Sequence, residues 1–426
     1  MNGSEGRRVV ITGVGAVTPI GAGKEELWRS VLEGRRGGRR ITLFDPSTYP
    51  SQVACEVPDF DPLDYLDAKR ARRLDRCSQF GLAAARMAVA DAGLVMERED
   101  RERVGVYLGS ALGGISYAED QHQEFIEGGL RHVSPMLALA VFGGANAANI
   151  SMELGAFGAS LGNANSCASG AIGVGEAFRA IKRGEVDVAV AGGAEAPIAP
   201  LTFGAFAVIK AMSMRNDDPA TASRPFDRDR DGFVMAEGAG VLVLEELGHA
   251  ITRDATVYGE VRGFGVTSDA YHMTSPRPDG TQAARAMSEA LAEAGLTPEG
   301  IDYVAAHASA TKLNDSTETL AIKKALGDYA YEVPISGTKG MHGHALGASG
   351  AIELVICALV LQRGVLPATV NLFEPDLSCD LRYIRDHPVE RRVTTMLKNS
   401  FGFGGINAAL VLRTVESRAG ATHTGS

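Results

Sequence analysis

The chain has 426 residues, 45% of them hydrophobic, so it is long enough for two packed halves and apolar enough for a sizeable core. Its 42 basic and 52 acidic residues give a net charge of −10, which argues against a nucleic-acid-binding protein. Five scattered cysteines favour a reducing cytoplasm over a disulfide framework, and no apolar run approaches the roughly 20 residues of a membrane span. We therefore expect a soluble cytoplasmic protein with no membrane segment.

The first element expected is a buried strand and glycine turn over residues 8–20, which read RVVITGVGAVTPI. Gly13 and Gly15 suggest a dinucleotide-binding fingerprint. However, its third glycine position is occupied by Thr18, and Pro19 follows. A helix N-terminus that would hold a pyrophosphate is therefore missing, and a structural role for the glycines is favoured.

A basic cluster at 69–76 comes next, ahead of an amphipathic helix expected at 80–91. Its cations at helical spacing are Lys69, Arg72, Arg73 and Arg76. Such runs are often only solvated faces, but one basic stripe would also steer an acidic protein partner to this surface.

Strands alternate with helices along the rest of the chain. Apolar runs at 104–110, 185–193 and 234–246 predict strands, and 134–152 predicts a small-residue helical stretch that lines a pocket or an interface. This alternation predicts a layered α/β architecture in which helices cover buried sheets.

Cys167 lies in the stretch NANSCASGAIGVG, just before an Ala/Gly-rich run at helical spacing. The pattern places it at a helix N-terminus, where backbone N–H groups and the helix dipole stabilise a thiolate and lower the pKa of the thiol. The alternative is a buried cysteine that acts as a small hydrophobic residue.

Two later segments carry histidines where apolar elements meet glycine loops. Residues 302–311 are strand-like and reach His307, whereas 337–348 carry Lys339, His342 and His344 on a glycine-rich loop before a helix expected at 351–361. A cysteine with distant histidines is typical of a nucleophile whose partners converge only in the fold. The H-x-H pair supplies only two of the usual three or four metal ligands, so we expect no metal site.

The remaining elements are loops and short strands. Residues 215–231 and 268–280 predict polar loops, and a helix is expected at 283–294. The glycine turn NSFGFGGIN at 399–407 separates strands expected at 393–398 and 408–413.

Several motifs resemble those of one family, the β-ketoacyl-acyl carrier protein synthases, specifically the elongating type II enzymes and the ketosynthase subunits of type II polyketide synthases. The likeness runs from about residue 8 to about residue 413. Its motifs are SCASG around Cys167, AGGAEAP at 191–197, ASRPFDRDRDGFVMAEGAG at 222–240, SDAYHMTSP at 268–276, TKGMHGH ending at His344 and NSFGFGG at 399–405.

The resemblance implies a thiolase-like α/β fold, in which two similar halves form a five-layer α-β-α-β-α sandwich. We expect an N-terminal half with the nucleophile over residues 1–255, a C-terminal half with the histidines over 256–413 and a disordered tail over 414–426.

The resemblance also implies roles for matching residues. Cys167 is similar to the acyl-accepting nucleophile, His307 and His344 to the pair that acts on the malonyl thioester, and Lys339 to the lysine that orders this cluster. Other implied roles are an oxyanion hole and gate (Cys167, Phe401), a supporting network (Asp315, Glu318), a gating loop (Asp269, His272, Gly402, Gly404), pantetheine contacts (Ser309, Thr311) and carrier-protein contacts (Lys69, Arg72, Arg73, Lys210).

The implied activity is that of an acyltransferase, a β-ketoacyl-acyl carrier protein synthase that joins malonyl units to a Cys-bound acyl chain by decarboxylative Claisen condensation. No bound cofactor is expected, because substrates arrive on the phosphopantetheine arm of acyl carrier protein. The expected partners are this carrier protein and either a chain-length-factor homologue or a second copy of the chain, across an interface formed partly by 134–152.

Two motifs depart from the family pattern: HGTST is here HASAT at 307–311, and TKSMTGH is here TKGMHGH. These departures favour the ketosynthase subunit of a type II polyketide synthase. The alternatives are a homodimeric elongating synthase of fatty-acid synthesis and a non-catalytic chain-length-factor-like subunit, which Cys167 argues against. A thiolase would need a second cysteine in the C-terminal glycine loop, and Lys339 with His344 disfavours an initiating synthase.

Overall fold

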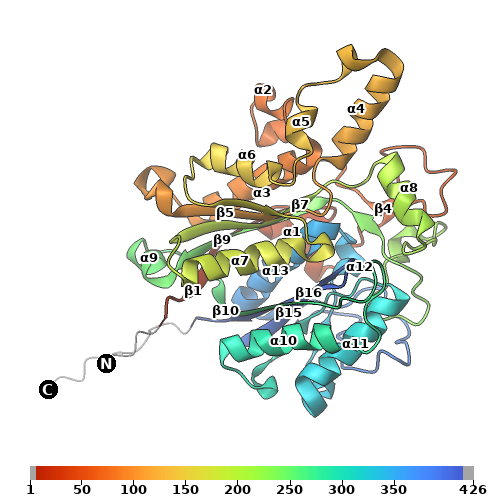
Figure 1. Cartoon of the computed structure of the whole chain (residues 1–426). Coiled ribbons are helices and arrows are strands. Elements are labelled where there is room, and N and C mark those ends of the chain that lie inside the picture. Colours follow the sequence, from red (N-terminus) through yellow and green to blue (C-terminus); the bar gives the residue numbers. More distant parts are fainter. Residues whose placement is uncertain (1–5, 416–426) are drawn as a thin grey trace.

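The computed structural model describes residues 6–415 and places most of their strands in one large mixed sheet (Figure 1). Along this sheet the strands follow the order β12 (Ile335–Ser336), β11 (Tyr303–Ala305), β15 (Thr395–Gly402), β16 (Ile406–Arg413), β10 (Gly259–Ser268), β1 (Val9–Thr18), β9 (Gly238–Glu246), β7 (Val188–Glu195), β5 (Val104–Gly109) and β6 (Ser160–Asn163). Short β2 (Gly21–Ala22) pairs with the end of β1.

The sheet divides into two halves that meet where β1 pairs with β10. This antiparallel pairing joins Val9, Val10 and Ile11 to Val261, Glu260 and Gly259. Helices α7 (Ser169–Lys182) and α13 (Leu346–Arg363) pack against each other in the space between the two halves, which Figure 1 shows at the centre of the molecule.

Further helices cover the outer face of each half-sheet. The β9–β7–β5 half is covered by α3 (Arg76–Ala92) and α6 (Ala145–Leu154), and α10 (Thr281–Ala294) covers β10 and β16 with α11 (Lys312–Leu326) beside it. The expected five-layer α-β-α-β-α architecture is therefore confirmed (Figure 1).

The first strand explains the glycines that suggested a nucleotide site. Gly13 and Gly15 lie within β1 rather than in a turn, and the strand continues to Thr18. A Cβ on Gly13 would lie 2.2 Å from the carbonyl oxygen of Ala88, and one on Gly15 would lie 2.1 Å from that of Ala84. The glycines thus allow α3 to pack directly on the strand.

The apolar helix α13 is the centre of the core. Among the described residues it is the one helix long and apolar enough to cross a membrane, and 89% of its apolar window is buried inside the protein. It starts five residues earlier than the sequence indicated, at Leu346.

Two other segments differ from expectation. The stretch at 134–152 is not one helix, because Gly143 and Gly144 separate α5 (Leu137–Ala140) from α6. The helix expected at 80–91 starts at Arg76, since the Asp75 carboxylate accepts the N–H of Ser78 and caps its N-terminus.

The remaining elements are short or lie outside the main layers. They are α1 (Lys24–Leu32), α2 (Ala68–Ala71), α4 (Ile115–Gly128), α8 (Pro200–Val208), α9 (Leu247–Thr252), α12 (Lys339–His342), and the short strands β3 (Arg39–Arg40), β4 (Val53–Cys55), β8 (Met235–Ala236), β13 (Val365–Leu366) and β14 (Val389–Glu390). The division expected at 255/256 falls between α9 and β10 and stays a prediction. Of the tail expected from 414, residues 416–426 lie outside the described part, whereas Thr414 still donates its N–H to the Thr394 carbonyl at 2.8 Å.

Candidate active site

Cys167 lies where the chain leaves the edge strand β6 and enters α7. It is part of the 3₁₀ turn Ser166–Ala168, directly before the first residue of the helix. Ser166 has a φ of 51°, a left-handed conformation that is uncommon for a non-glycine residue. The Ser169 hydroxyl stabilises the turn by donating to the Ser166 carbonyl at 2.7 Å. The cysteine lines a cavity of about 270 Å³ together with the residues described below.

The thiol of Cys167 differs from the expected low-pKa nucleophile. Burial raises its pKa above the ordinary value, although the Ser166 hydroxyl, the backbone N–H of Phe403 and the charge of Lys339 oppose this effect. The prediction of a lowered pKa was wrong, because the helix terminus acts on a sulfur that is shielded from water. The thiol must therefore lose its proton when it attacks, rather than rest as a thiolate.

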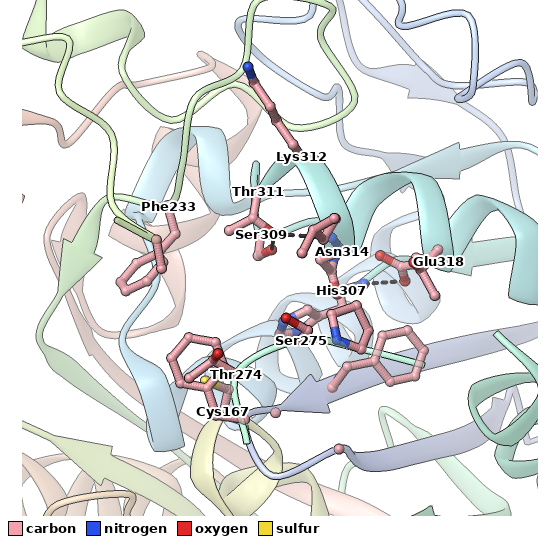
Figure 2. Close-up of a pocket in the computed structure, with 18 of the residues that line it drawn as sticks. Cys167, Phe233, Thr274, Ser275, His307, Ser309, Thr311, Lys312, Asn314 and Glu318 are labelled. Atoms are coloured by element: carbon pink, nitrogen blue, oxygen red, sulfur yellow. Dashed lines mark hydrogen bonds between the residues drawn. The ribbon is translucent and has the colours of Figure 1, made fainter. Parts of the chain in front are cut away.

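The two histidines meet in the same cavity, although 37 positions separate them in the sequence. His307 follows β11 and His344 lies between α12 and α13; their ring centroids are 5.3 Å apart with planes at 81°. Figure 2 shows His307 near Cys167 in this pocket. Burial, then the charge of Lys339, lowers the pKa of each ring well below 6.5, so both imidazoles are neutral near pH 7.

The contacts of each ring determine which nitrogen carries its proton. The ammonium of Lys339 lies 3.5 Å from Nδ1 of His307, and an ammonium only donates, so Nε2 of this ring carries the hydrogen. Nδ1 of His344 lies 2.7 Å from the Ser349 hydroxyl. When that hydroxyl donates, Nε2 of His344 also carries the hydrogen.

Lys339 is not on a loop, as the sequence suggested, but in the short helix α12, where it is fully buried. Its ammonium donates to the His307 carbonyl and pairs with the carboxylate of Glu353. A second buried lysine, Lys398 on β15, pairs with the other oxygen of Glu353 at 2.9 Å. Sequence reasoning missed Glu353 and Lys398, although each is a lone charge in an apolar run, which is a signal of a buried ion pair.

Two carboxylates hold the backbone beside His307. Glu318 accepts the N–H groups of His307 and Ala308 at 2.7 and 2.8 Å, and Asp315 accepts that of Ala310 at 3.1 Å. Ala308 and Ala310, which replace the glycine and the serine of HGTST, have φ values of 50° and 66°. The carboxylates therefore hold two alanines in a conformation that favours glycine.

The hydroxyls expected to contact pantetheine line the cavity, as Figure 2 shows. Ser309 and Thr311 have their hydroxyl oxygens 3.1 Å apart, and Thr311 also caps α11 by accepting the N–H of Asn314 at 3.2 Å. Both are on the same wall as His307.

The glycine turn requires a correction. Phe401 and Gly402 are not in the turn: they form the end of β15, and the buried ring of Phe401 packs on His307 at 5.7 Å between centroids. The turn consists of residues 403–405; the backbone N–H of Phe403 opposes the rise in the pKa of Cys167, and the Phe403 ring stacks on Phe206. Gly404, in the turn as expected, has a φ of 83°.

The loop at 268–280 is tied to this turn. Asp269 donates its N–H to the Gly405 carbonyl at 2.8 Å, and Gly404 donates to the Met273 carbonyl at 2.7 Å. The Asp269 carboxylate lines the cavity and accepts the side-chain amide of Asn407 at 2.8 Å. His272 is instead exposed, and its ring nitrogen accepts the N–H groups of Thr274 and Ser275.

The basic residues lie on the surface. Lys210 is exposed at the cavity, whereas exposed Lys69, Arg72 and Arg73 do not line it. The expected stripe is interrupted, because α2 and α3 are separate helices and Arg76 pairs with Glu237 at 2.6 Å.

His342 is fully buried in α12. Its Nε2 lies 3.0 Å from the Thr338 hydroxyl, and burial lowers its pKa to about 4. Within residues 6–415, no group of three or more His, Cys, Asp or Glu side chains is placed to hold a metal ion.

Comparison with known proteins gives consistent matches along the chain. The beta-ketoacyl synthase N-terminal domain matches residues 6–250 and the C-terminal domain matches residues 258–373. The chain is 44% identical over 409 residues to 3-oxoacyl-[acyl-carrier-protein] synthase 2 of Synechocystis sp., which covers 96% of this chain and 98% of that protein. The corresponding protein of Coxiella burnetii is 42% identical over 411 residues, 96% of this chain and 99% of its own length.

Solved structures include polyketide ketosynthases. A type II polyketide synthase acyl-carrier protein in complex with its ketosynthase bound to the hexaketide (AntDE:AntF) matches with a TM-score of 0.90 and 34% identity, over 97% of this chain and 100% of that one. The ishigamide ketosynthase/chain length factor matches with a TM-score of 0.91 and 36% identity, over 96% of this chain and 100% of that one.

Proposed function

The chain belongs to the β-ketoacyl synthase family, and from this premise we propose that it condenses a Cys167-bound acyl group with a malonyl thioester carried by acyl carrier protein. The observation that carries the proposal is the meeting of Cys167, His307 and His344 on one cavity at the tip of α7. Each of these residue types suits one part of the reaction.

In the first step, Sγ of Cys167 attacks the acyl thioester carbonyl. The bond between this carbonyl and the pantetheine sulfur breaks, and the pantetheine thiolate takes up the proton lost by the cysteine. Cysteine suits both the formation and the later breakdown of the acyl-enzyme, because sulfur is a strong nucleophile and a good leaving group. The backbone N–H groups of Cys167 and Phe403 are the proposed donors to the carbonyl oxygen, so Phe403 takes the oxyanion-hole role expected for Phe401.

In the second step, the malonyl thioester loses CO₂, and the electron pair of the broken C–C bond moves onto the thioester oxygen. Two neutral imidazoles with hydrogens on Nε2 are suited to stabilise this enolate oxygen, and each preorganised donor of this kind is worth about 3 to 4 kcal/mol. Ser309 and Thr311 are the proposed contacts of the pantetheine arm.

In the third step, the enolate carbon attacks the Cys167 thioester. A new C–C bond forms, the C–S bond breaks, and Cys167 leaves as a thiolate that takes up one proton. The products are CO₂ and a β-ketoacyl chain two carbons longer on the carrier protein. No bound cofactor has a role in this sequence of steps.

We further propose that the chain is the ketosynthase subunit of a type II polyketide synthase, supported by its similarity to the ketosynthases above and by the HASAT and TKGMHGH departures. The specific support for the alternative, a homodimeric fatty-acid elongating enzyme, is the higher identity of 44% to the Synechocystis synthase. A non-catalytic subunit is disfavoured because Cys167 lines the cavity. We also propose a cytoplasmic location, because all five cysteines are free thiols, as is usual in a reducing compartment.

The dimer partner is proposed to pack on the β6 edge. β6 ends the main sheet, and its residues 160–162 are exposed. Exposed apolar side chains gather on β6 and the α4, α5 and α6 region: Phe125, Ile126, Leu130, Leu139, Val141, Phe142, Met152, Phe157 and Leu161. An exposed strand edge beside such a patch suits a second subunit. The carrier protein, which is acidic in this family, is proposed to approach through Lys210 and the cluster of Lys69, Arg72 and Arg73.

The test is to incubate the full chain with acyl carrier protein bearing a short acyl group and to map the adduct by peptide mass spectrometry. An acyl group on Cys167, absent from Cys167→Ala, is the expected result. No adduct with the wild-type chain would overturn the proposal and favour a non-catalytic subunit. Repeating the assay with and without the product of a neighbouring gene separates the two pathways, since a heterodimer requirement favours the polyketide enzyme.

A further inference from the structure

Two buried lysines share one carboxylate directly behind the candidate histidines. Lys339 and Lys398 each have no exposed side-chain surface, and both pair with Glu353 of α13, itself 3% exposed. Charged side chains are almost never buried without a partner, so three such groups in the interior require an explanation.

Each lysine occupies its own oxygen of Glu353. The Lys339 ammonium donates a hydrogen bond to Oε1, whereas the Lys398 ammonium forms an ion pair at 2.9 Å with Oε2, which accepts no hydrogen bond from the described residues. Lys398 is further fixed on β15, because its ammonium donates to the Asn399 carbonyl and lies 3.3 Å from the Ser400 hydroxyl. The Lys398 ammonium thus lies among a carbonyl, a hydroxyl and a carboxylate oxygen, and the carboxylate is the one that it shares with Lys339.

This arrangement determines the position of Lys339. With Oε2 occupied by Lys398, Lys339 remains on Oε1, from which it also reaches the His307 carbonyl and Nδ1. Without Lys398, both oxygens of Glu353 would attract the single remaining ammonium, and the contact with His307 would compete with a bidentate ion pair.

We propose that Lys398 is a positioning residue for the condensation: a tethered cation that holds Glu353 and Lys339 so that His307 keeps its orientation and its hydrogen on Nε2. The inference rests on the proposed function, because it assigns Lys398 to the same site. Lys398 does not line the cavity and is not a catalytic residue.

The electrostatics of the cluster support this role. Burial raises the pKa of Glu353, but Lys339 and Lys398 oppose it and hold this pKa below the ordinary value. Lys398 also contributes, after burial and Lys339, to the lowered pKa of both His307 and His344. The other titratable groups that face the cluster include Glu318 on α11, His342 on α12, Cys357 on α13 and Tyr303 on β11.

Three substitutions test the proposal in the full chain. Lys398→Met removes the charge at nearly constant volume, and Lys398→Ala leaves space for a small cation. Lys323→Met is the matched control, since this lysine of α11 also forms an ion pair, with Asp380, but lies near the surface. Because a misplaced group near the chemistry costs about 100-fold, we expect Lys398→Met to lower kcat for malonyl condensation about 100-fold with KM nearly unchanged.

Chemical rescue separates positioning from folding. Ammonium or methylammonium ions should raise the kcat of Lys398→Ala at least about tenfold, because each supplies an N–H donor and a positive charge in place of the lysine. Tetramethylammonium should not raise it, since this ion is too large for the site and has no N–H group. If Lys398→Ala does not fold, Lys398→Ser takes its place in the same assay.

The outcomes distinguish this inference from the proposed function. A wild-type chain that fails to condense would overturn the proposed function itself. A wild-type chain that condenses, together with an unchanged kcat in folded Lys398→Met, would overturn only the role of Lys398. Loss of activity that small ammonium ions do not restore would assign Lys398 to packing alone and would also overturn the proposal.

Discussion

Ser349 offers a sharp test of the tautomer assigned to His344. Its fully buried hydroxyl lies 2.7 Å from Nδ1 of the ring, and we assign it as the donor. Ser349→Ala removes this donor, so Nδ1 faces apolar helix α13 and the tautomer with hydrogen on Nε2 loses its preference. Decarboxylation should slow because that hydrogen is the one offered to the enolate oxygen.

The expected decrease in kcat follows from the free energy of the hydrogen bond between Ser349 and His344. A hydrogen bond between neutral groups contributes about 0.5 to 1.5 kcal/mol net, which corresponds to about a 2- to 12-fold decrease in kcat, centred near 5-fold. Complete loss of the donor in His344→Ala should lower kcat about 100- to 1000-fold. Ser349→Ala should leave acylation of Cys167 unchanged, because this step does not use the enolate.

The assay is CO₂ release from malonyl carrier protein by the acylated enzyme, with Ser316→Ala on the exposed face of α11 as control. Because Ser349 acts through His344, adding Ser349→Ala to His344→Ala should cause no further loss. Additive effects of the two substitutions, or a wild-type kcat in Ser349→Ala, would refute the assignment.

Three other predictions address the surface, the interface and pH. Arg72→Glu with Arg73→Glu should weaken the reaction with carrier protein in a salt-dependent way and spare small acyl thioesters; equal loss with both substrates would refute this docking site. Leu161→Glu, in the exposed edge strand, should shift the oligomer towards monomer in light scattering, and an unchanged mass would exclude the β6 interface. Because the pKa of His342 is lowered to about 4 from 6.5, the folded chain stays neutral there while the unfolded chain binds a proton, so stability falls as pH drops from about 6.5 towards about 4. His342 alone should contribute about 2 kcal/mol to the loss of stability between pH 7 and pH 5 in urea unfolding, and His342→Thr should make the total decrease smaller by this amount; an equal decrease in both proteins would contradict it.

The parts of the site that could be predicted lie at the ends of elements with strong patterns. Cys167 precedes a clear helix, and His307 follows a clear strand, so the sequence places both at the ends of regular elements. Their meeting with His344 depended on the resemblance, because periodicity does not give the order of strands in a sheet.

The parts that could not be predicted depend on tertiary contacts. β15 extends through Gly402 because its residues pair with β16, so Phe403 rather than Phe401 lies in the turn. The helix-terminus argument gave the wrong direction for the pKa of Cys167, since burial is a property of the packed layers and not of the local sequence. The partnership of Lys339 and Lys398 with Glu353 likewise depends on how β15 packs against α12 and α13.

Single turnover by pre-acylated enzyme tests the central claim most directly. The full chain, loaded with an acyl group on Cys167, is mixed with carrier protein bearing malonyl labelled with ¹³C at its methylene carbon, and both proteins are weighed by intact mass spectrometry. We predict a labelled β-ketoacyl chain on the carrier protein and a free thiol at Cys167. A cysteine that keeps its acyl group, or loses it to water while the carrier protein gains no carbon, would contradict the account.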